Sequence, residues 1–284
     1  MQSNYLFYDL ETSGLNKAFD QIQQFAGKIV DKDFKEQESH FLEAKILPDV
    51  IPSPYAMITH RVSLADDAHR ESEYKVVRSI HALANRPQTI SLGYNTLGFD
   101  DELLRFAFHR NLLTPYTHQY ANGCMRMDIF PMVPFFYLFS HDIIKWPSIN
   151  GKISFKLEAL AEENQWASGR AHHAMHDVDA TISLAKHLRE ENQVMWEYLT
   201  GFFNKYTDQK RITSLNGITL DEKKHYVGLY VDAKMGAANH FMAPCLYLGT
   251  HKQYKNTTLW LRLDKPLPKE WDYDQLLSQG CIVK

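Results

Sequence analysis

The sequence has 284 residues, of which 44% are hydrophobic and 23% charged, so it predicts a globular protein with one large or two modest domains and excludes an intrinsically disordered chain. The formal net charge of −3 excludes a protein that grips duplex DNA by bulk positive charge, so nucleic-acid binding would come from local patches. Three widely separated cysteines, Cys124, Cys245 and Cys281, are typical of a reducing compartment. With no visible signal peptide, and an apolar run at 132–139 too short to span a membrane, we expect a cytoplasmic protein.

The first 200 residues are predicted to form a mixed α/β domain. Apolar, β-prone runs predict strands at 4–11, 25–30, 38–46 and 89–94, the first three as a meander. Helical spacing of apolar residues predicts helices at 63–85, 100–111, 127–139 (broken by its prolines), 154–165 (capped by Ser154) and 177–192.

The composition changes near residue 217, and the rest of the chain is predicted to be rich in β-strands. Strands are expected at 225–231, 245–248 and 257–263, and in the last one leucines alternate with other residues, as in a half-buried sheet. We therefore expect one domain over 1–200, followed over 201–284 by a linker and a short β-rich domain that is partial.

Asp9 and Glu11 lie two positions apart on the first predicted strand, so both side chains point to the same face. Two carboxylates held together are costly unless a cation lies between them. The competing interpretation is an edge strand with two solvated acids, but the apolar neighbours Leu6, Phe7 and Tyr8 favour a buried central strand.

Asp100 begins a predicted helix directly after Phe99. An acidic residue is also favoured there by the helix dipole alone, which would apply equally to Asp101 and Glu102. Asp100 is the better candidate for a metal ligand because it directly follows the Phe expected to anchor the turn.

A third group combines His172, His173, His176 and Asp177 within six residues. Cysteine partners for zinc are missing, and the nearby acids favour Mg²⁺ or Mn²⁺, which prefer oxygen ligands. Asp179 competes with Asp177, but in a helix the two point about 200° apart, so only one can face the site. Four acids could thus hold two ions for an in-line displacement, with a histidine of near-neutral pKa as general base.

Three segments resemble the exonuclease motifs of the DEDDh superfamily: 8–12, 93–102 and 172–177. More closely, nearly the whole chain resembles bacterial exonuclease I, with support from 58–60, 154–158 and 241–244. The resemblance implies a ribonuclease-H-like α/β fold followed by an SH3-like β domain. It also implies metal-dependent removal of 5′-mononucleotides from the 3′ end of single-stranded DNA during repair or recombination.

The resemblance also implies roles for individual residues. The metal-binding acids would be Asp9, Glu11, Asp100 and Asp177, which would hold two Mg²⁺ ions with Mn²⁺ as the alternative, and His172 would be the general base. Substrate contacts would come from Glu11, Arg105, Tyr116, Tyr120, Arg126, Lys156 and Lys205.

Three features depart from the family pattern. Lys156 stands where the family usually has Arg, which keeps the charge but loses bidentate geometry on phosphate. His173 and His176 replace residues that are often acidic and small in relatives, and we have no physical account of them. Relatives also continue through a complete SH3-like domain into a helical domain, so we expect this form to keep the chemistry and lose processivity.

Single-stranded DNA and a single-strand-binding protein are the expected partners of a monomer. Three other interpretations stay open on the motifs alone. They are an exonuclease acting on RNA or short oligonucleotides, a non-catalytic single-strand-binding module, and the proofreading subunit of a polymerase.

Overall fold

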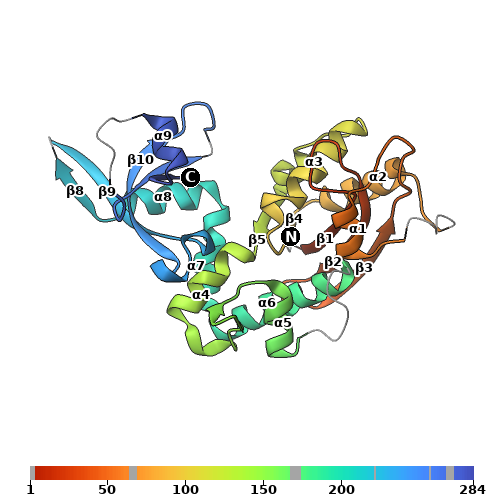
Figure 1. Ribbon diagram of the computed structural model, residues 1–284, viewed down its shortest axis with the longest axis horizontal. Helices are drawn as coiled ribbons and strands as arrows, with labels where there is room; N and C mark the ends of the chain where they lie inside the picture. Colours follow the sequence, from red (N-terminus) through yellow and green to blue (C-terminus); the bar gives the residue numbers. More distant parts are fainter. Residues whose placement is uncertain (1–3, 64–68, 167–173, 221, 256, 267–271) are drawn as a thin grey trace. The chain divides into compact units, whose positions relative to one another are not determined.

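The computed structural model describes residues 4–63, 69–166, 174–220, 222–255, 257–266 and 272–284. The chain forms two compact units, the first comprising residues 1–133 and 140–193 and the second residues 134–139 and 194–284 (Figure 1). The boundary between the two units falls after residue 193. The predicted domain limits of 1–200 and 201–284 remain a proposal. Among the described residues, no helix has the length and apolar character needed to cross a membrane.

The first unit is built on a mixed five-stranded sheet with the order β3-β2-β1-β4-β5. Strands β1, β2 and β3 pair antiparallel, whereas β4 and β5 run parallel to β1, so the predicted meander is confirmed. The strands of this sheet are β1 (Asn4–Thr12), β2 (Ile22–Val30), β3 (Glu36–Glu43), β4 (Thr89–Gly93) and β5 (Met125–Asp128). A separate hairpin joins β6 (Ser148–Ile149) and β7 (Lys152–Ile153).

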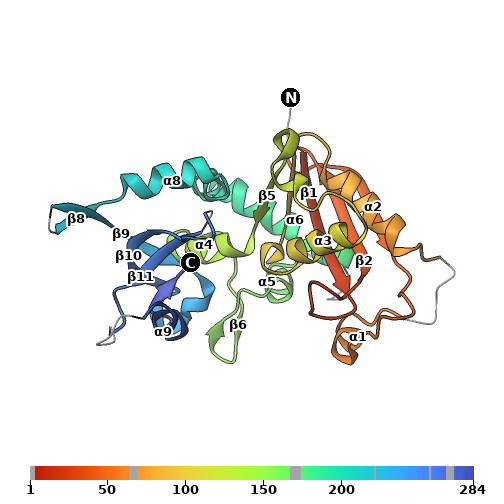
Figure 2. The same ribbon diagram turned by 90° about the horizontal axis from the view of Figure 1, so that it is seen from above.

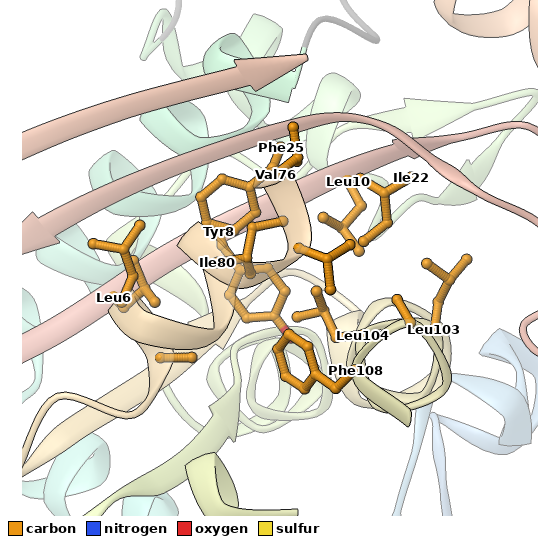
Figure 3. Close-up of a cluster of buried hydrophobic side chains, with 14 of the residues drawn as sticks. Leu6, Tyr8, Leu10, Ile22, Phe25, Val76, Ile80, Leu103, Leu104 and Phe108 are labelled. Carbon is orange, nitrogen blue, oxygen red and sulfur yellow. The ribbon is translucent and has the colours of Figure 1, made fainter. Parts of the chain in front are cut away.

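Helices cover both faces of this sheet. The unit contains α1 (Pro54–His60), α2 (Glu73–Ala84), α3 (Asp100–Arg110), α5 (Leu157–Asn164) and α6 (Ala174–Glu191). Leu6, Tyr8 and Leu10 of β1 pack with α2 and α3 into one buried cluster (Figure 3). Helix α6 packs against β1 and β2 (Figure 2), and the alternation of side chains along β1 therefore directs Asp9 and Glu11 away from that cluster.

The second unit contains a five-stranded antiparallel sheet with the order β12-β11-β10-β9-β8. Its elements are α4 (Val133–Phe139), α7 (Gln193–Thr200), α8 (Lys205–Ser214), β8 (Gly217–Leu220), β9 (Lys223–Val231), β10 (Met242–Thr250), β11 (Thr258–Arg262), α9 (Tyr273–Ser278) and β12 (Ile282–Val283). Leu261, Leu276, Cys281 and Ile282 form its buried core. Helix α4 joins this unit through ring contacts such as that of Tyr137 with Phe241, whose centroids are 5.5 Å apart. The three predicted strands are present.

Three predicted helices need correction. The helix expected at 63–85 begins only at Glu73. Ser72 is its N-cap, because its side chain accepts the backbone N–H of Lys75 at 3.4 Å. The spacing of apolar residues did not indicate this cap. Ser154 does not cap α5, because Lys156 precedes that helix in an extended conformation. The apolar run at 127–139 is divided between β5 and α4, and a short apolar run cannot be assigned to strand or helix from periodicity alone.

The predicted linker also contains more structure than expected. Helix α8 lies within it, and its N-terminus is capped by the side chain of Asn204, which accepts the N–H groups of Tyr206 and Thr207 at 3.1 Å each.

Candidate active site

Three carboxylates meet on the α6 side of β1. One oxygen each from Asp9, Glu11 and Asp177 lies within 4.8 Å of the others, and all three residues are half-buried. Strand β1 supplies the first two, and the first turn of α6 supplies the third. Because α6 is in contact with β1, acids 166 positions apart in the sequence (177 minus 11) reach one place. Such a group of oxygen donors fits a hard divalent cation.

Asp100 stands at the start of α3 and is buried, with 7% of its surface exposed. It is not a member of the group within 4.8 Å, but its charge contributes to the raised pKa of both Asp9 and Glu11. The four predicted acids therefore interact electrostatically, although Asp100 does not lie within 4.8 Å of all three of the others.

The pKa values show how strongly this site disfavours negative charge. Burial, followed by the charges of Asp177 and Asp100, raises the pKa of Glu11 to about 8. Burial also raises the pKa of Asp100 to about 7, and the pKa of Asp9 rises well above its usual value through burial and the neighbouring acids. Desolvation and like charges both penalise ionised carboxylates, and a bound cation would offset both effects.

Asp179 belongs to a different interaction. Its carboxylate accepts a hydrogen bond from Lys28 Nζ on β2 at 2.6 Å, and the same ammonium lies 2.9 Å from Glu36 on β3. Asp177 belongs to the group of three acids and Asp179 does not, which agrees with the expectation from helical geometry that only one of the two can face the site and with the family resemblance that favoured Asp177. His172 and His173 lie outside the described residues, so the role predicted for His172 stays a prediction.

His60 holds the backbone just beyond Glu11. The N–H of Val62 donates to its Nδ1 at 3.1 Å, so Nε2 carries the proton and donates to the carbonyl of Thr12, also at 3.1 Å. This contact falls where the pairing register of β1 shifts, between Glu11 and Thr12. The sequence marked residues 58–60 only as part of a family resemblance, because nothing local shows that the ring reaches back to β1.

The predicted substrate contacts lie in several places. Arg105 donates to the hydroxyl of Tyr116 at 2.7 Å and lies over its ring, while the exposed Tyr120 follows in the same segment of the first unit. Arg126 pairs with the buried carboxylate of Asp101.

The two predicted lysine contacts lie on different units. Lys156 is 69% exposed at the start of α5 in the first unit and lies 3.5 Å from Glu158, whereas Lys205 begins α8 in the second unit. Their roles on substrate stay predictions.

Comparison with known proteins places this geometry in a family. The RNase_T exonuclease family model matches residues 6–185. Exodeoxyribonuclease I of Buchnera aphidicola (subspecies Schizaphis graminum) is 32% identical over 273 residues, which cover 94% of this chain and 54% of the relative. The Escherichia coli K12 enzyme of the same name is 34% identical over 208 residues, covering 72% of this chain and 44% of its own. The chain thus spans about half the length of these curated relatives.

Solved structures agree with the sequence comparison. E. coli exonuclease I in complex with a dT13 oligonucleotide superposes with a TM-score of 0.88 at 30% identity, covering 98% of this chain and 59% of that one. Exonuclease I from Methylocaldum szegediense gives a TM-score of 0.83 at 28% identity, covering 93% and 55%. The expected ribonuclease-H-like exonuclease domain and the β-rich domain after it are confirmed. The chain belongs to the RNase_T exonuclease family, and within that family it is similar to the bacterial exonuclease I proteins over nearly all of its length.

Proposed function

We propose that this chain is a metal-dependent 3′→5′ exonuclease that hydrolyses single-stranded DNA to 5′-mononucleotides. The observation that carries the proposal is the group of Asp9, Glu11 and Asp177, whose oxygens lie within 4.8 Å of one another. The E. coli relative has been solved with single-stranded oligonucleotides and in a zinc-bound form with DNA, which supports this substrate and a divalent ion.

Asp9, Glu11, Asp100 and Asp177 would hold two Mg²⁺ ions, with Mn²⁺ as the alternative. The all-oxygen donor set fits these ions, since it contains no sulfur and Mg²⁺ prefers carboxylates and water. Bound in pairs, such ions stabilise the attacking and leaving oxygens of an in-line displacement at phosphorus. The acids must ionise to bind, so their raised pKa values tie metal binding to the release of protons.

His172 would take the proton from the attacking water. Asp177 reaches the site from the first described turn of α6 (Ala174–Glu191), and His172 precedes Asp177 by five positions in the sequence. A histidine titrates near neutral pH and can accept this proton at little cost. His172→Ala should therefore remove nucleotide release while leaving the binding of Mn²⁺ intact, and normal release by this variant would refute the role.

Cationic and aromatic side chains would bind the single-stranded DNA in addition to the metal site. Tyr116 and Tyr120 are exposed by 47% and 70%, which leaves ring surface for stacking on bases. Arg105, Arg126, Lys156 and Lys205 would contact phosphates, and Glu11 would contact the terminal nucleotide as well as metal.

We further propose that the protein acts as a monomer in DNA repair or recombination, in company with a single-strand-binding protein. A cytoplasmic site of action agrees with the three buried free cysteines.

End-labelled single-stranded DNA, duplex DNA and RNA, each incubated with Mg²⁺ and with EDTA, test the proposal. We expect 5′-mononucleotides from the 3′ end of single-stranded DNA, with Mg²⁺ only. Nucleotide release from RNA instead of DNA would refute the proposed substrate, and release in the presence of EDTA would refute the proposed metal dependence.

A further inference from the structure

The connection between β4 and α3 delivers Asp100 to the site, and it is irregular. Asn95 has a left-handed conformation with φ of 62°, and a single 3₁₀ turn at Thr96–Gly98 follows it. Such a loop has few backbone hydrogen bonds of its own, so its shape must be fixed by its surroundings. The placement of Asp100 therefore depends on what holds residues 94–99.

Asp128, at the end of β5, holds this loop from the neighbouring strand. Its carboxylate accepts the N–H of Asn95 at 2.8 Å and that of Leu97 at 3.0 Å, and it also accepts the N–H of Phe130 at 3.0 Å. Only 3% of the residue is exposed. In the sheet, Asp128 pairs with Gly93, the last residue before the loop. One buried side chain thus ties together the two segments that leave β4 and β5.

The chemistry of this contact requires a carboxylate. Three N–H donors converge on two oxygens, and an ionised carboxylate can accept all three because it carries only acceptors. An Asn at this position would offer one oxygen, and its NH₂ group would face an N–H donor. Burial raises the pKa of Asp128 to about 6, while the three N–H groups lower it, so the hydrogen bonds offset part of the cost of burying the charge.

A second observation shows that the end of β4, from which the loop starts, is tightly enclosed. A Cβ atom on Gly93 would lie 2.3 Å from Cγ2 of Thr96 and 2.5 Å from the carbonyl oxygen of Tyr8. No side chain fits there, so Gly93 lies closely between Thr96 of the loop and the strand that carries Asp9. Asp128 fixes the loop by hydrogen bonds, and Gly93 permits the close approach of Thr96 and Tyr8 to the end of β4.

We propose that Asp128 is a positioning residue that sets the place of Asp100 relative to Asp9, Glu11 and Asp177, and thereby the affinity of the site for divalent metal. The inference rests on the proposed function, in which Asp100 is a metal ligand. Outer contacts that orient metal ligands are typically worth about 10–100-fold in metal affinity. Asp128 would act through the loop without contacting metal or DNA.

Asp128→Asn tests the proposal, with Asp31→Asn as the matched control. The Asp31 carboxylate also accepts two backbone N–H groups, from Asp33 and Lys35 at 2.9 and 3.0 Å, but it follows the end of β2 that is remote from Asp9. Mn²⁺ binding is measured by calorimetry, and nucleotide release is measured against Mg²⁺ concentration and, at saturating Mg²⁺, against single-stranded DNA concentration.

We expect Asp128→Asn to weaken Mn²⁺ binding and to raise the Mg²⁺ needed for half-maximal release by about 10–100-fold. The KM for DNA at saturating Mg²⁺ should change by less than about 3-fold, and Asp31→Asn should behave as wild type. Wild-type metal dependence in Asp128→Asn would overturn the proposal, as would equal losses of metal and DNA affinity.

A second variant covers the case in which Asp128→Asn does not fold. Asn95→Gly keeps every backbone donor and accepts the positive φ freely, so it loosens the loop without a clash. We expect a several-fold rise in the Mg²⁺ requirement, and no rise would count against the proposal. If wild type binds Mn²⁺ but releases no nucleotide, the proposed function fails, whereas the comparison of Mn²⁺ affinities still decides the role of Asp128.

Discussion

Asp100 and Asp101 are neighbours on α3, yet they belong to opposite electrostatic environments. Burial raises the pKa of Asp100 to about 7. Burial would also raise the pKa of Asp101, but the hydrogen bond from His118 and the charge of Arg126 outweigh it, and the pKa is lowered. The protein supplies a histidine hydrogen bond and the Arg126 guanidinium to Asp101, whereas other acids surround Asp100. A buried carboxylate without such a partner, next to others like it, is where an external cation is needed.

The largest effect on activity should come from removing one acid of the group formed by Asp9, Glu11 and Asp177. Asp9→Asn takes away a carboxylate that the proposal assigns to metal binding, and we expect nucleotide release to fall by more than about 100-fold, beyond the loss typical of an outer-shell contact. Initial rates of mononucleotide release at saturating Mg²⁺ measure this. Glu162→Gln, an exposed acid on α5, is the control and should be unaffected. A normal rate in Asp9→Asn would refute the assignment.

Neutralising Asp100 and neutralising Asp101 should change the free energy of unfolding of the metal-free protein in different directions. Asp101→Asn leaves the buried His118 and the guanidinium of Arg126 without their anion, and we expect a loss of about 2–3 kcal/mol in the free energy of unfolding. Asp100→Asn removes an acid from a repulsive group and should be neutral or stabilising. Urea unfolding in EDTA measures both, and equal losses would contradict the comparison.

The metal-free protein should lose stability as the pH rises from 6 to 8. Glu11 and Asp100 have folded-state pKa values of about 8 and 7, above their usual values, so the folded state holds more protons than the unfolded state in this range. Their contribution to the free energy of unfolding is present at low pH and is lost as the pH rises through these values. The loss should amount to about 1 kcal/mol or more. Melting temperatures in EDTA measure the trend, which saturating Mg²⁺ should weaken. A flat profile in EDTA would contradict the raised values.

The smallest effect is expected at Lys156. It is exposed, and its 3.5 Å contact with Glu158 is a weak surface pair. Lys156→Arg supplies a guanidinium suited to phosphate, so we expect the KM for single-stranded DNA to fall by about 2–3-fold with kcat unchanged. Steady-state kinetics at low salt tests this. A change in kcat alone would place Lys156 in another role.

Much of the site was predictable because its signals are local. The spacing of Asp9 and Glu11 follows from the strand period, and the separation of Asp177 from Asp179 follows from the helix period. The contacts that hold these residues were not predictable, since each joins distant segments. Lys28 reaches Asp179, His60 reaches Thr12, and Asp128 reaches the loop before Asp100.

The same difference between local signals and contacts of distant segments applies to the prediction of the fold. Periodicity located the long strands and helices of the first unit, but it misplaced the start of α2, which begins at Glu73 after the cap residue Ser72 and not at residue 63. The second half of the short strand β5, Met127 and Asp128, was included in a predicted helix, because the parallel pairing of β5 with β4 leaves no local signal in the sequence.

Calorimetric titration of the wild-type chain with Mn²⁺ at pH 7, repeated in two buffers of different ionisation enthalpy, tests the central claim most directly. We expect that metal binds and that binding releases protons, because Glu11 and Asp100 are partly protonated at this pH and must ionise to coordinate. Asp9→Asn should bind much more weakly. Absence of binding, or binding without proton release, would contradict the claim that Asp9, Glu11, Asp100 and Asp177 form a metal site.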